Sequence, residues 1–204
     1  MPQVSLDKMV QVLTTQPALV SFPTDTVPAL AAAPAQAALI FAAKQRPPAK
    51  PLILMGASLS DLLPYVSVEE SVMVEKSAMV EWQVIAQRHW PGQLTLVLPV
   101  SSRPPQDLSP LLAGTEASTL GIRVPAHPVA LALLSRTGPL ATTSANLSGQ
   151  PALSDITAIA KTFPKALTLA PELYQKDASS GTPSTIAKWT AAGWQILRQG
   201  EVQL

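Results

Sequence analysis

Apolar residues in this chain recur with two different spacings, and each spacing predicts its own kind of element. Leu6, Met9, Val10 and Leu13 lie one, three or four positions apart, which predicts an amphipathic helix over residues 5–16. Helices are also predicted over residues 35–44, 69–89, 128–136 and 155–163, with a helical turn over 60–63. Compact apolar runs predict strands over residues 18–22, 52–55, 94–98, 120–124, 140–143, 166–169, 185–189 and 194–198.

Prolines divide these elements. The chain of 204 residues holds 21 prolines and only 9 glycines, and proline ends helices and is excluded from central strands. Helices and strands alternate between these breaks, which is typical of an α/β (α+β) fold with a twisted mixed sheet flanked by helices. The length suits a single domain, which we expect to span residues 1–204. Residues 101–119 have neither spacing, and we expect a surface excursion there.

The composition excludes several classes of protein. Without cysteine, the chain cannot form disulfides, thiolate zinc sites, iron–sulfur clusters or a cysteine nucleophile. A charged content of 13% and a net charge of +1 argue against disorder and against a strongly basic nucleic-acid binder. The longest charge-free apolar stretch, residues 26–43, is rich in alanine and is broken by Pro28 and Pro34. It is a poor membrane span, so we expect a soluble, cytoplasmic protein with no membrane contact.

Four of the predicted strand ends run directly into polar loops, over residues 23–26, 119–123, 142–146 and 181–185. In open α/β sheets, ligands bind at strand ends, where short hydroxyl or amide side chains contact them. Serine, threonine, asparagine and aspartate also favour ordinary turns, which is the better explanation for any single loop. Four such loops in one small chain favour a binding site.

A cationic cluster follows the second predicted helix. Lys44, Arg46 and Lys50 lie within seven residues, with prolines stiffening the chain between and after them. Closely spaced cations of this kind suit a polyanion such as a triphosphate. They are equally typical of a solvated helix end, where cations complement the helix dipole. The sequence contains no Gly-rich phosphate-binding motif, so a nucleotide would have to be held in another way.

No nucleophile with an adjacent base is apparent. The two histidines, His89 and His127, stand in no catalytic motif, and His127 beside Pro128 is typical of a helix start. Asp25 is the only acid inside a polar loop of interest. We therefore predict no catalytic side chain and no metal ligand, and expect any catalysis to rest on positioning and electrostatic stabilisation.

Seven short motifs, taken in order, resemble one known family. They are Ser-Phe-Pro-Thr-Asp-Thr-Val (21–27), Lys-Gln-Arg-Pro with Lys-Pro-Leu (44–47 and 50–52), Trp-Pro-Gly-Gln-Leu-Thr-Leu-Val-Leu (90–98), Gly-Ile-Arg-Val-Pro (121–125), Thr-Ser-Ala-Asn-Leu-Ser-Gly (143–149), Gly-Thr-Pro-Ser-Thr-Ile (181–186) and Ile-Leu-Arg-Gln-Gly (196–200). This order is similar to that of the YrdC/Sua5 family of threonylcarbamoyl-AMP synthases. The resemblance covers residues 5–202 and is to the family's short, single-domain form.

The resemblance implies an enzyme, a nucleotidyltransferase of tRNA processing. It would join L-threonine, bicarbonate or CO2, and ATP into L-threonylcarbamoyl-AMP and release pyrophosphate, with Mg2+ expected beside ATP. Partner proteins would then transfer the threonylcarbamoyl group to tRNA. The carbamate and the α-phosphate are both anions, so the site must align them and offset their repulsion. Cations and hydroxyls can do this without a catalytic triad.

Carried over motif by motif, the resemblance implies two groups of binding residues. The ATP contacts would be Lys44, Arg46, Lys50, Thr119, Ser144, Asn146 and Arg198. The threonine contacts would be Thr26, Arg123, Thr142 and Ser184. Arg123 would face the threonine carboxylate, because a guanidinium can bind both carboxylate oxygens. Without that ligand, we expect Arg123 to be an isolated cation in an apolar neighbourhood.

Three departures from the family pattern flank the expected threonine pocket. Pro28-Ala29-Leu30-Ala31 replaces Tyr-Gly-Leu-Gly, Met55 replaces a polar residue or histidine, and Ala187-Lys188 replaces Val-Asp. One alternative is therefore a degenerate paralogue that binds nucleotide or structured RNA without activating threonine.

Two further alternatives remain. The first is an RNA-binding module, for instance for double-stranded RNA, although 14 basic residues against 13 acidic ones argue against strong binding. The second is a carbamoyl-adenylate enzyme of hydrogenase maturation, whose larger chain carries cysteines that this sequence lacks.

Overall fold

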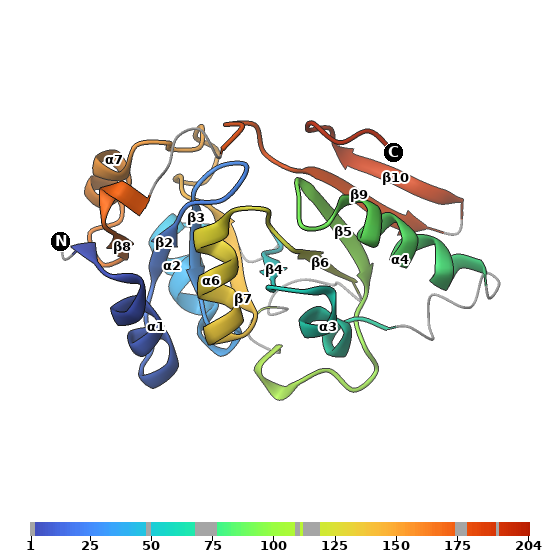
Figure 1. The fold of residues 1–204 in the computed structure, drawn as a ribbon, viewed down its shortest axis with the longest axis horizontal. Coiled ribbons are helices and arrows are strands. Elements are labelled where there is room, and N and C mark those ends of the chain that lie inside the picture. The colour runs from blue at the N-terminus through green and yellow to red at the C-terminus, as the bar shows by residue number, and fades with distance from the viewer. Residues whose placement is uncertain are drawn as a thin grey trace.

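One mixed sheet of ten strands runs through the described part of the chain (Figure 1). The computed structural model describes residues 3–47, 50–67, 77–108, 111, 119–173, 179–190 and 192–204. The strand order is β1-β8-β2-β3-β7-β4-β6-β5-β9-β10. The strands are β1 Gln3–Val4, β2 Val20–Phe22, β3 Ala29–Ala32, β4 Ile53–Met55, β5 Leu94–Pro99, β6 Thr119–Arg123, β7 Leu140–Ser144, β8 Leu167–Leu169, β9 Thr185–Thr190 and β10 Gly193–Arg198.

The sheet is mixed because it contains both parallel and antiparallel pairs of strands. The pairs β1–β8, β2–β8, β4–β6 and β5–β9 are parallel, whereas β2–β3, β3–β7, β4–β7, β5–β6 and β9–β10 are antiparallel. Several strand ends from distant parts of the sequence therefore meet near the centre of the sheet. The predicted mixed sheet is confirmed.

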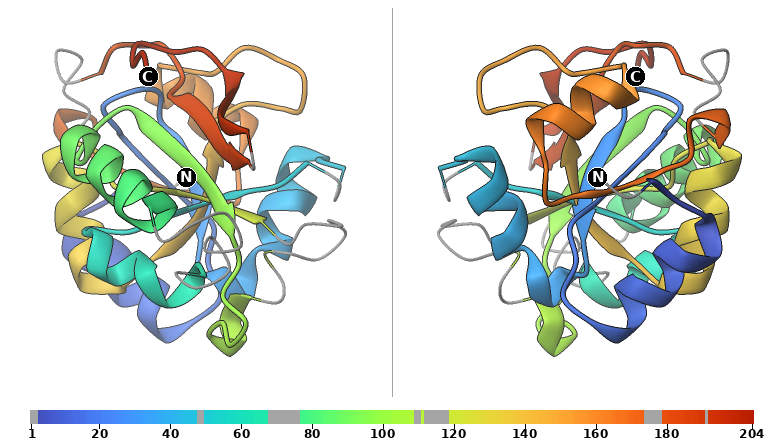
Figure 2. Two further views of the ribbon diagram at one scale, coloured as in Figure 1. Left: turned by 90° about the vertical axis from the view of Figure 1, so that its right-hand side faces the viewer. Right: turned by 90° about the vertical axis from the view of Figure 1, so that its left-hand side faces the viewer.

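Helices cover the two faces of the sheet unequally. The α-helices of the described residues are α1 Leu6–Thr15, α2 Ala38–Lys44, α3 Leu59–Leu62, α4 Ser77–His89, α6 Pro128–Thr137 and α7 Ile156–Thr162. Figure 2 shows α1, α3, α4 and α6 on one side of the sheet and α2 on the opposite side. The face on the α2 side is thus left partly open, and it carries the cavity described below.

Side-chain caps fix where four of these helices begin, and in α3 the Ser58 hydroxyl accepts from the Asp61 amide. The Ser5 hydroxyl accepts a hydrogen bond from the Lys8 amide, and the Asp155 carboxylate accepts one from the Ala158 amide. The ring nitrogen Nδ1 of His127 accepts one from the Val129 amide, with Pro128 at the first helical position. Each cap satisfies an amide that the helix itself leaves without a partner. The predicted N-cap at Asp155 and the predicted helix start at His127 are confirmed.

The apolar side chains form two clusters. The larger cluster contains Trp82 of α4, Ile40 of α2 and Leu96 of β5, all fully buried. The second contains Met9 of α1 and Leu133 of α6, packed with residues of β2 and of its neighbours β3 and β8. Leu54 of β4 and Ile122 of β6 also belong to the larger cluster, so packed side chains support strands that form the cavity floor.

Three sequence expectations need correction. Residues 29–32, over which no helix or strand was predicted, form strand β3, which is buried on both faces and pairs with β2 and β7. Residues 101–119 are not simply a surface excursion, because Leu108 and Leu111 are buried in the core. The two-residue strand β1 was not predicted. The predicted helix over 69–89 begins at Ser77 in the described chain, and its expected first part lies outside the described residues. No helix of the described ranges is long and apolar enough to cross a membrane.

Candidate active site

A cavity of about 340 Å³ lies on the open face of the sheet. Its floor follows the register of the strands, which aligns Lys188, Val97, Gly121, Ile53 and Thr142 in one row across β9, β5, β6, β4 and β7. Gly121 lies in the middle of this row. A Cβ added there would stand 3.5 Å from the side chains of Ile53 and Thr95, so the glycine leaves that volume to the cavity.

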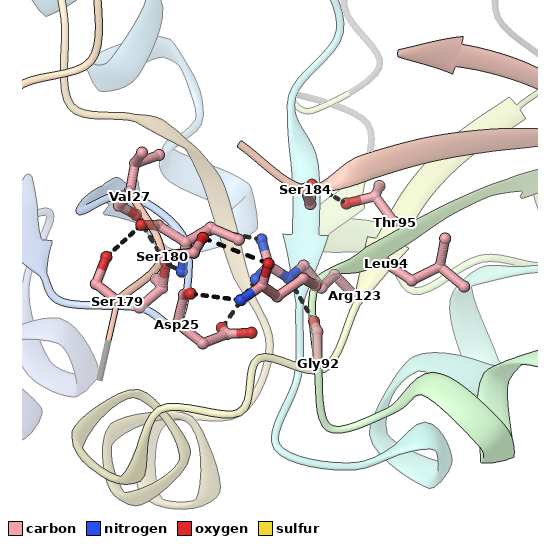
Figure 3. A network of polar contacts seen from close by, with 12 residues as sticks. Asp25, Val27, Gly92, Leu94, Thr95, Arg123, Ser179, Ser180 and Ser184 are labelled. Atoms are coloured by element: carbon pink, nitrogen blue, oxygen red, sulfur yellow. Dashed lines mark hydrogen bonds and ion pairs between the residues drawn. The ribbon is translucent and has the colours of Figure 1, made fainter. Parts of the chain in front are cut away.

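Arg123, at the end of β6, is held from three directions (Figure 3). Its Nε donates to the Gly92 carbonyl at 2.9 Å, Nη1 to the Thr26 hydroxyl at 2.9 Å, and Nη2 to Asp25 Oδ1 at 2.8 Å. The residue is 2% exposed. Burial lowers the pKa of Arg123, and the Asp25 carboxylate opposes that shift. A guanidinium has five N–H donors, so two remain for a ligand.

The Asp25–Arg123 ion pair corrects the expectation of an isolated cation. The two residues are 98 positions apart, and both are buried. The chain therefore supplies a carboxylate that neutralises Arg123 whether or not a ligand is present. This orients the guanidinium before a ligand arrives.

The loop that carries Asp25 and Thr26 is tied to two other segments. The Gln93 side chain and the Ser180 amide both donate to the Asp25 carbonyl, at 3.0 and 3.1 Å. The Thr26 carbonyl accepts from the Ser179 hydroxyl and from the Gly181 amide, the latter at 3.0 Å. These contacts fix the position of the Thr26 hydroxyl against Arg123.

Pro28 does not disturb this arrangement. It is buried directly before β3, and its carbonyl accepts a hydrogen bond from the Ala145 amide at 2.8 Å. The loop that joins Thr26 to β3 is therefore integrated into the sheet. The departure from the family pattern at Pro28 therefore leaves the contacts of Arg123 intact, whereas the departures at Met55 and Lys188 lie in the cavity wall.

A second polar group closes the β9 side of the cavity. The hydroxyls of Thr95 and Ser184 lie 2.9 Å apart, and Arg198 donates from Nη2 to the Ser184 hydroxyl at 3.2 Å and from Nε to the Ser184 carbonyl at 2.9 Å. Burial lowers the pKa of Arg198. Arg198, at the end of the last strand, therefore lines the same cavity as Arg123 of β6.

Lys44 lies behind the cavity wall. Its Nζ donates to the Ser144 carbonyl and, over 3.0 Å, to Asn146 Oδ1. Lys44 is 1% exposed, and burial, with a smaller effect of Arg46, lowers its pKa to about 7. Asn146 Oδ1 also accepts from the Ser144 hydroxyl, at 2.5 Å. Lys44 and Asn146 therefore hold Ser144 in place and do not themselves line the cavity.

Arg46 and Lys50 occupy different environments. The guanidinium of Arg46 donates from Nε to the Lys50 carbonyl at 3.1 Å and from Nη2 to the Pro51 carbonyl at 2.9 Å. Arg46 also lines the cavity. Burial lowers the pKa of Arg46. The Lys50 side chain is exposed and lies outside the lining.

The structure brings most of the sequence-predicted site residues together. Those that line the cavity are Thr26, Arg46, Thr119, Arg123, Thr142, Ser144, Ser184 and Arg198. Sequence reasoning missed Thr95, Gly121 and Lys188 as lining residues, although Met55 and Lys188 had been noted as departures from the family pattern. Strand alternation was the usable signal, since Gly121 precedes Arg123 by two positions and must share its face.

The cavity is strongly cationic. Arg46, Arg123, Lys188 and Arg198 line it, and no carboxylate is among its lining residues. The Lys188 ammonium makes no hydrogen bond or ion pair with the described residues. Nowhere in the described ranges do three or more histidines or acids gather as a metal site would require. This chemistry suits a ligand that carries several negative charges.

The fold and the cavity define a mixed α/β protein with a cavity lined by cations on its sheet. The chain belongs to the Sua5/YciO/YrdC family, whose model, described as telomere recombination, matches residues 13–200. The resemblance found in the sequence is thereby confirmed.

Relatives named threonylcarbamoyl-AMP synthase match most of the chain. The one from Pyrococcus abyssi is 38% identical over 149 residues, which is 71% of this chain and 40% of the relative. The one from Bacillus subtilis is 41% identical, over 65% of this chain and 36% of the relative. The one from Idiomarina loihiensis is 39% identical, over 65% of this chain and 67% of the relative. The chain thus spans less than half of the first two relatives and two thirds of the third.

Solved structures agree on the fold. A crystal structure of P. abyssi Sua5 complexed with L-threonine has a TM-score of 0.77 at 30% identity, covering 96% of this chain and 54% of that one. E. coli YciO has a TM-score of 0.74 at 23% identity, covering 97% of this chain and 90% of that one. The YciO likeness supports the fold alone.

Proposed function

We propose that this chain is an L-threonylcarbamoyladenylate synthase. It would join L-threonine, bicarbonate or CO2, and ATP to give threonylcarbamoyl-AMP and pyrophosphate. The observation that carries the proposal is the cavity itself, which is lined by an oriented Arg123 and three further cations and by no carboxylate. The names of the relatives and the L-threonine complex of P. abyssi Sua5 support the same reaction.

The amino acid would bind where Arg123 and Thr26 meet. The two free N–H groups of Arg123 would take the threonine carboxylate, while Asp25 keeps the guanidinium fixed. Thr26, Thr142 and Ser184 would complete this subsite, and all three are buried at the cavity wall. Thr142 donates its hydroxyl proton to the Ile53 carbonyl, so its oxygen would act as an acceptor toward the substrate.

ATP would occupy the more open part of the cavity. Arg46, Thr119, Ser144 and Arg198 line it and would contact the nucleotide. Lys44 and Asn146 would act indirectly, by holding the strand end that carries Ser144. Lys50, being exposed, would reach only phosphates that extend beyond the cavity.

The reaction needs no side-chain nucleophile. The threonine amine attacks CO2 and loses a proton to give a carbamate, and a carbamate oxygen then attacks the α-phosphorus. The bond from the α-phosphorus to the bridging oxygen breaks, and pyrophosphate leaves with that electron pair. The protein contributes alignment and the cations that offset repulsion between carbamate and triphosphate. Because the cavity wall holds no carboxylate, we propose that Mg2+ enters as the counter-ion of ATP, bound through phosphate oxygens.

The wider role follows from this reaction. We propose that residues 1–204 act as a single YrdC-like domain in the cytoplasm, and that the product passes to the proteins that transfer threonylcarbamoyl to tRNA. Direct binding of double-stranded RNA is the competing use of a cationic surface, and it would weaken steeply with salt.

The decisive assay uses the purified chain with ATP, Mg2+ and bicarbonate, with and without L-threonine. We expect threonylcarbamoyl-AMP and pyrophosphate to form in equal amounts, and only when threonine is present. ATP binding without any such product would overturn the proposed reaction.

A further inference from the structure

Two buried polar atoms, one on the ion-pair partner of Arg123 and one on the histidine that begins α6, have no hydrogen-bond partner among the described residues. They are Oδ2 of Asp25, the oxygen that does not contact Arg123, and Nε2 of His127. Asp25 is 5% exposed and His127 1% exposed. A buried polar atom without a partner is costly, and one water molecule that bridges this donor and this acceptor would satisfy both.

The hydrogen bond at the other ring nitrogen fixes which atom of His127 can donate. The Val129 amide donates to Nδ1 over 3.2 Å, so Nδ1 carries no proton. In the neutral ring the proton is therefore on Nε2. Burial lowers the pKa of His127, which favours the neutral ring, and the Asp25 carboxylate acts against this shift, so the two groups interact.

The connection between β6 and α6 explains why these groups meet. Only three residues separate Arg123, the last residue of β6, from His127, the N-cap of α6. The same short segment thus places the Arg123 side chain in the cavity and the His127 ring in the buried layer next to it.

We propose that His127 is a positioning residue for the amino-acid subsite. Its Nε2–H donates to Asp25 Oδ2 through one bridging water, because the two atoms make no direct hydrogen bond, and so fixes the carboxylate whose Oδ1 accepts from Arg123. A line of hydrogen bonds then runs from the N-terminus of α6 to the guanidinium that would take the substrate carboxylate. This assignment rests on the proposed function of Arg123.

Two substitutions separate positioning from helix capping. His127→Asn keeps an acceptor at the position of Nδ1 and so keeps the cap, but it removes the donor at Nε2. His127→Gln places an amide donor near the position of Nε2 but loses the short capping acceptor. His127→Asn should therefore keep the folding stability but weaken substrate binding. His127→Gln should lower the folding stability but keep substrate binding.

We expect His127→Asn to unfold near the wild-type temperature while its KM for threonine rises about fivefold, because the carboxylate that orients Arg123 loses the donor that fixes it. Its KM for ATP should change less than about twofold. His127→Gln should unfold at a lower temperature but keep a KM for threonine close to that of the wild type. If the KM for threonine follows the loss of stability in both variants, His127 only caps the helix and the proposal is wrong.

A second measurement does not depend on the reaction. Nitrogen-15 NMR of the wild-type protein, with His89→Gln used to assign the two rings, reports which nitrogen of His127 carries the proton. We expect a neutral ring protonated at Nε2, and a changed Nε2 signal in Asp25→Asn. An unchanged His127 signal in Asp25→Asn would overturn the proposal even if the chain makes threonylcarbamoyl-AMP. A changed signal in a chain without that activity would leave the hydrogen bond standing and refute only the function.

Discussion

Lys44 Nζ donates to Asn146 Oδ1 across 3.0 Å, which fastens the end of α2 to the loop after β7. The lysine is buried, and its ammonium lies beside a second cation, Arg46. The sequence cluster of Lys44, Arg46 and Lys50 is therefore not one uniform phosphate-binding patch. Lys44 is buried and holds the loop after β7, Arg46 lines the cavity, and Lys50 is exposed.

Lys44 should make the stability of the protein depend on pH. Its pKa is about 7 in the folded protein, against an ordinary value of 10.5. Between these values the unfolded chain binds the extra proton, so the free energy of unfolding rises with pH in this window, by at most about 1.4 kcal/mol per unit. Below the folded pKa, both states are protonated and this dependence ends.

Urea unfolding of the wild type and Lys44→Met between pH 6 and pH 10, a range chosen to bracket the expected window, tests this prediction. The difference in the free energy of unfolding should change with pH, because methionine does not titrate. Lys161→Met, on the exposed side of α7, is the control and should follow the wild type. Parallel curves for Lys44→Met and the wild type would contradict a buried, titrating lysine.

Arg46 should matter more to ATP than Lys50. Arg46→Ala should weaken ATP binding by about 1.5–3 kcal/mol, the range for a charge-assisted hydrogen bond. Lys50→Ala should cost less, because its side chain is exposed and off the cavity wall. Calorimetric titration with ATP measures both, and Arg136→Ala, an exposed cation paired with Asp7, is the matched control. Unchanged ATP binding in Arg46→Ala would indicate that this arginine only ends α2.

Arg123→Lys should raise the KM for threonine more than the KM for ATP. Lysine retains the charge that pairs with Asp25 but cannot hold Asp25, Thr26 and a carboxylate with one planar fork. Arg123→Ala should destabilise the fold by about 3–5 kcal/mol, because it leaves the buried Asp25 charge uncompensated. Steady-state kinetics measures the two KM values of Arg123→Lys, and thermal unfolding measures the loss of stability in Arg123→Ala. An equal loss for both substrates in Arg123→Lys would show that Arg123 organises the whole cavity rather than the amino-acid subsite.

Lys188 should contribute to binding although the sequence analysis did not place it in the site. It lines the cavity and has no partner in the described residues, so its charge is available to an anion. Lys188→Gln should weaken ATP binding about fivefold and reduce the salt dependence of that binding. Titrations at two salt concentrations measure both effects, with Lys161→Gln as the control. An unchanged affinity and salt slope would place the Lys188 charge outside the bound ligand's reach.

Much of the fold could be predicted from the sequence because most elements have a clear spacing and a clear boundary. Strand β3 could not, since its four residues, Ala-Leu-Ala-Ala, are buried on both faces and show no alternation. Small side chains between prolines resemble a loop unless the partner strands β2 and β7 are known.

The candidate site could be predicted residue by residue only where motifs carried it. The burial of Lys44 could not, because the chain reverses at Gln45, whose φ of 49° is left-handed. The pairing of Asp25 with Arg123 joins two loops far apart in the sequence, and no local pattern indicates it. Contacts of this kind arise from the strand order of the sheet, which the sequence alone does not define.

The central claim is that this cavity joins threonine, CO2 and ATP in one product. The most direct test is incubation of the purified chain with carbon-13 bicarbonate, ATP and Mg2+, with and without L-threonine, followed by mass spectrometry of the adenylate product. The account predicts threonylcarbamoyl-AMP that carries one labelled carbon, formed only with threonine present and strongly reduced in Arg123→Lys. An adenylate without the label, or no adenylate from a chain that binds ATP, would contradict it.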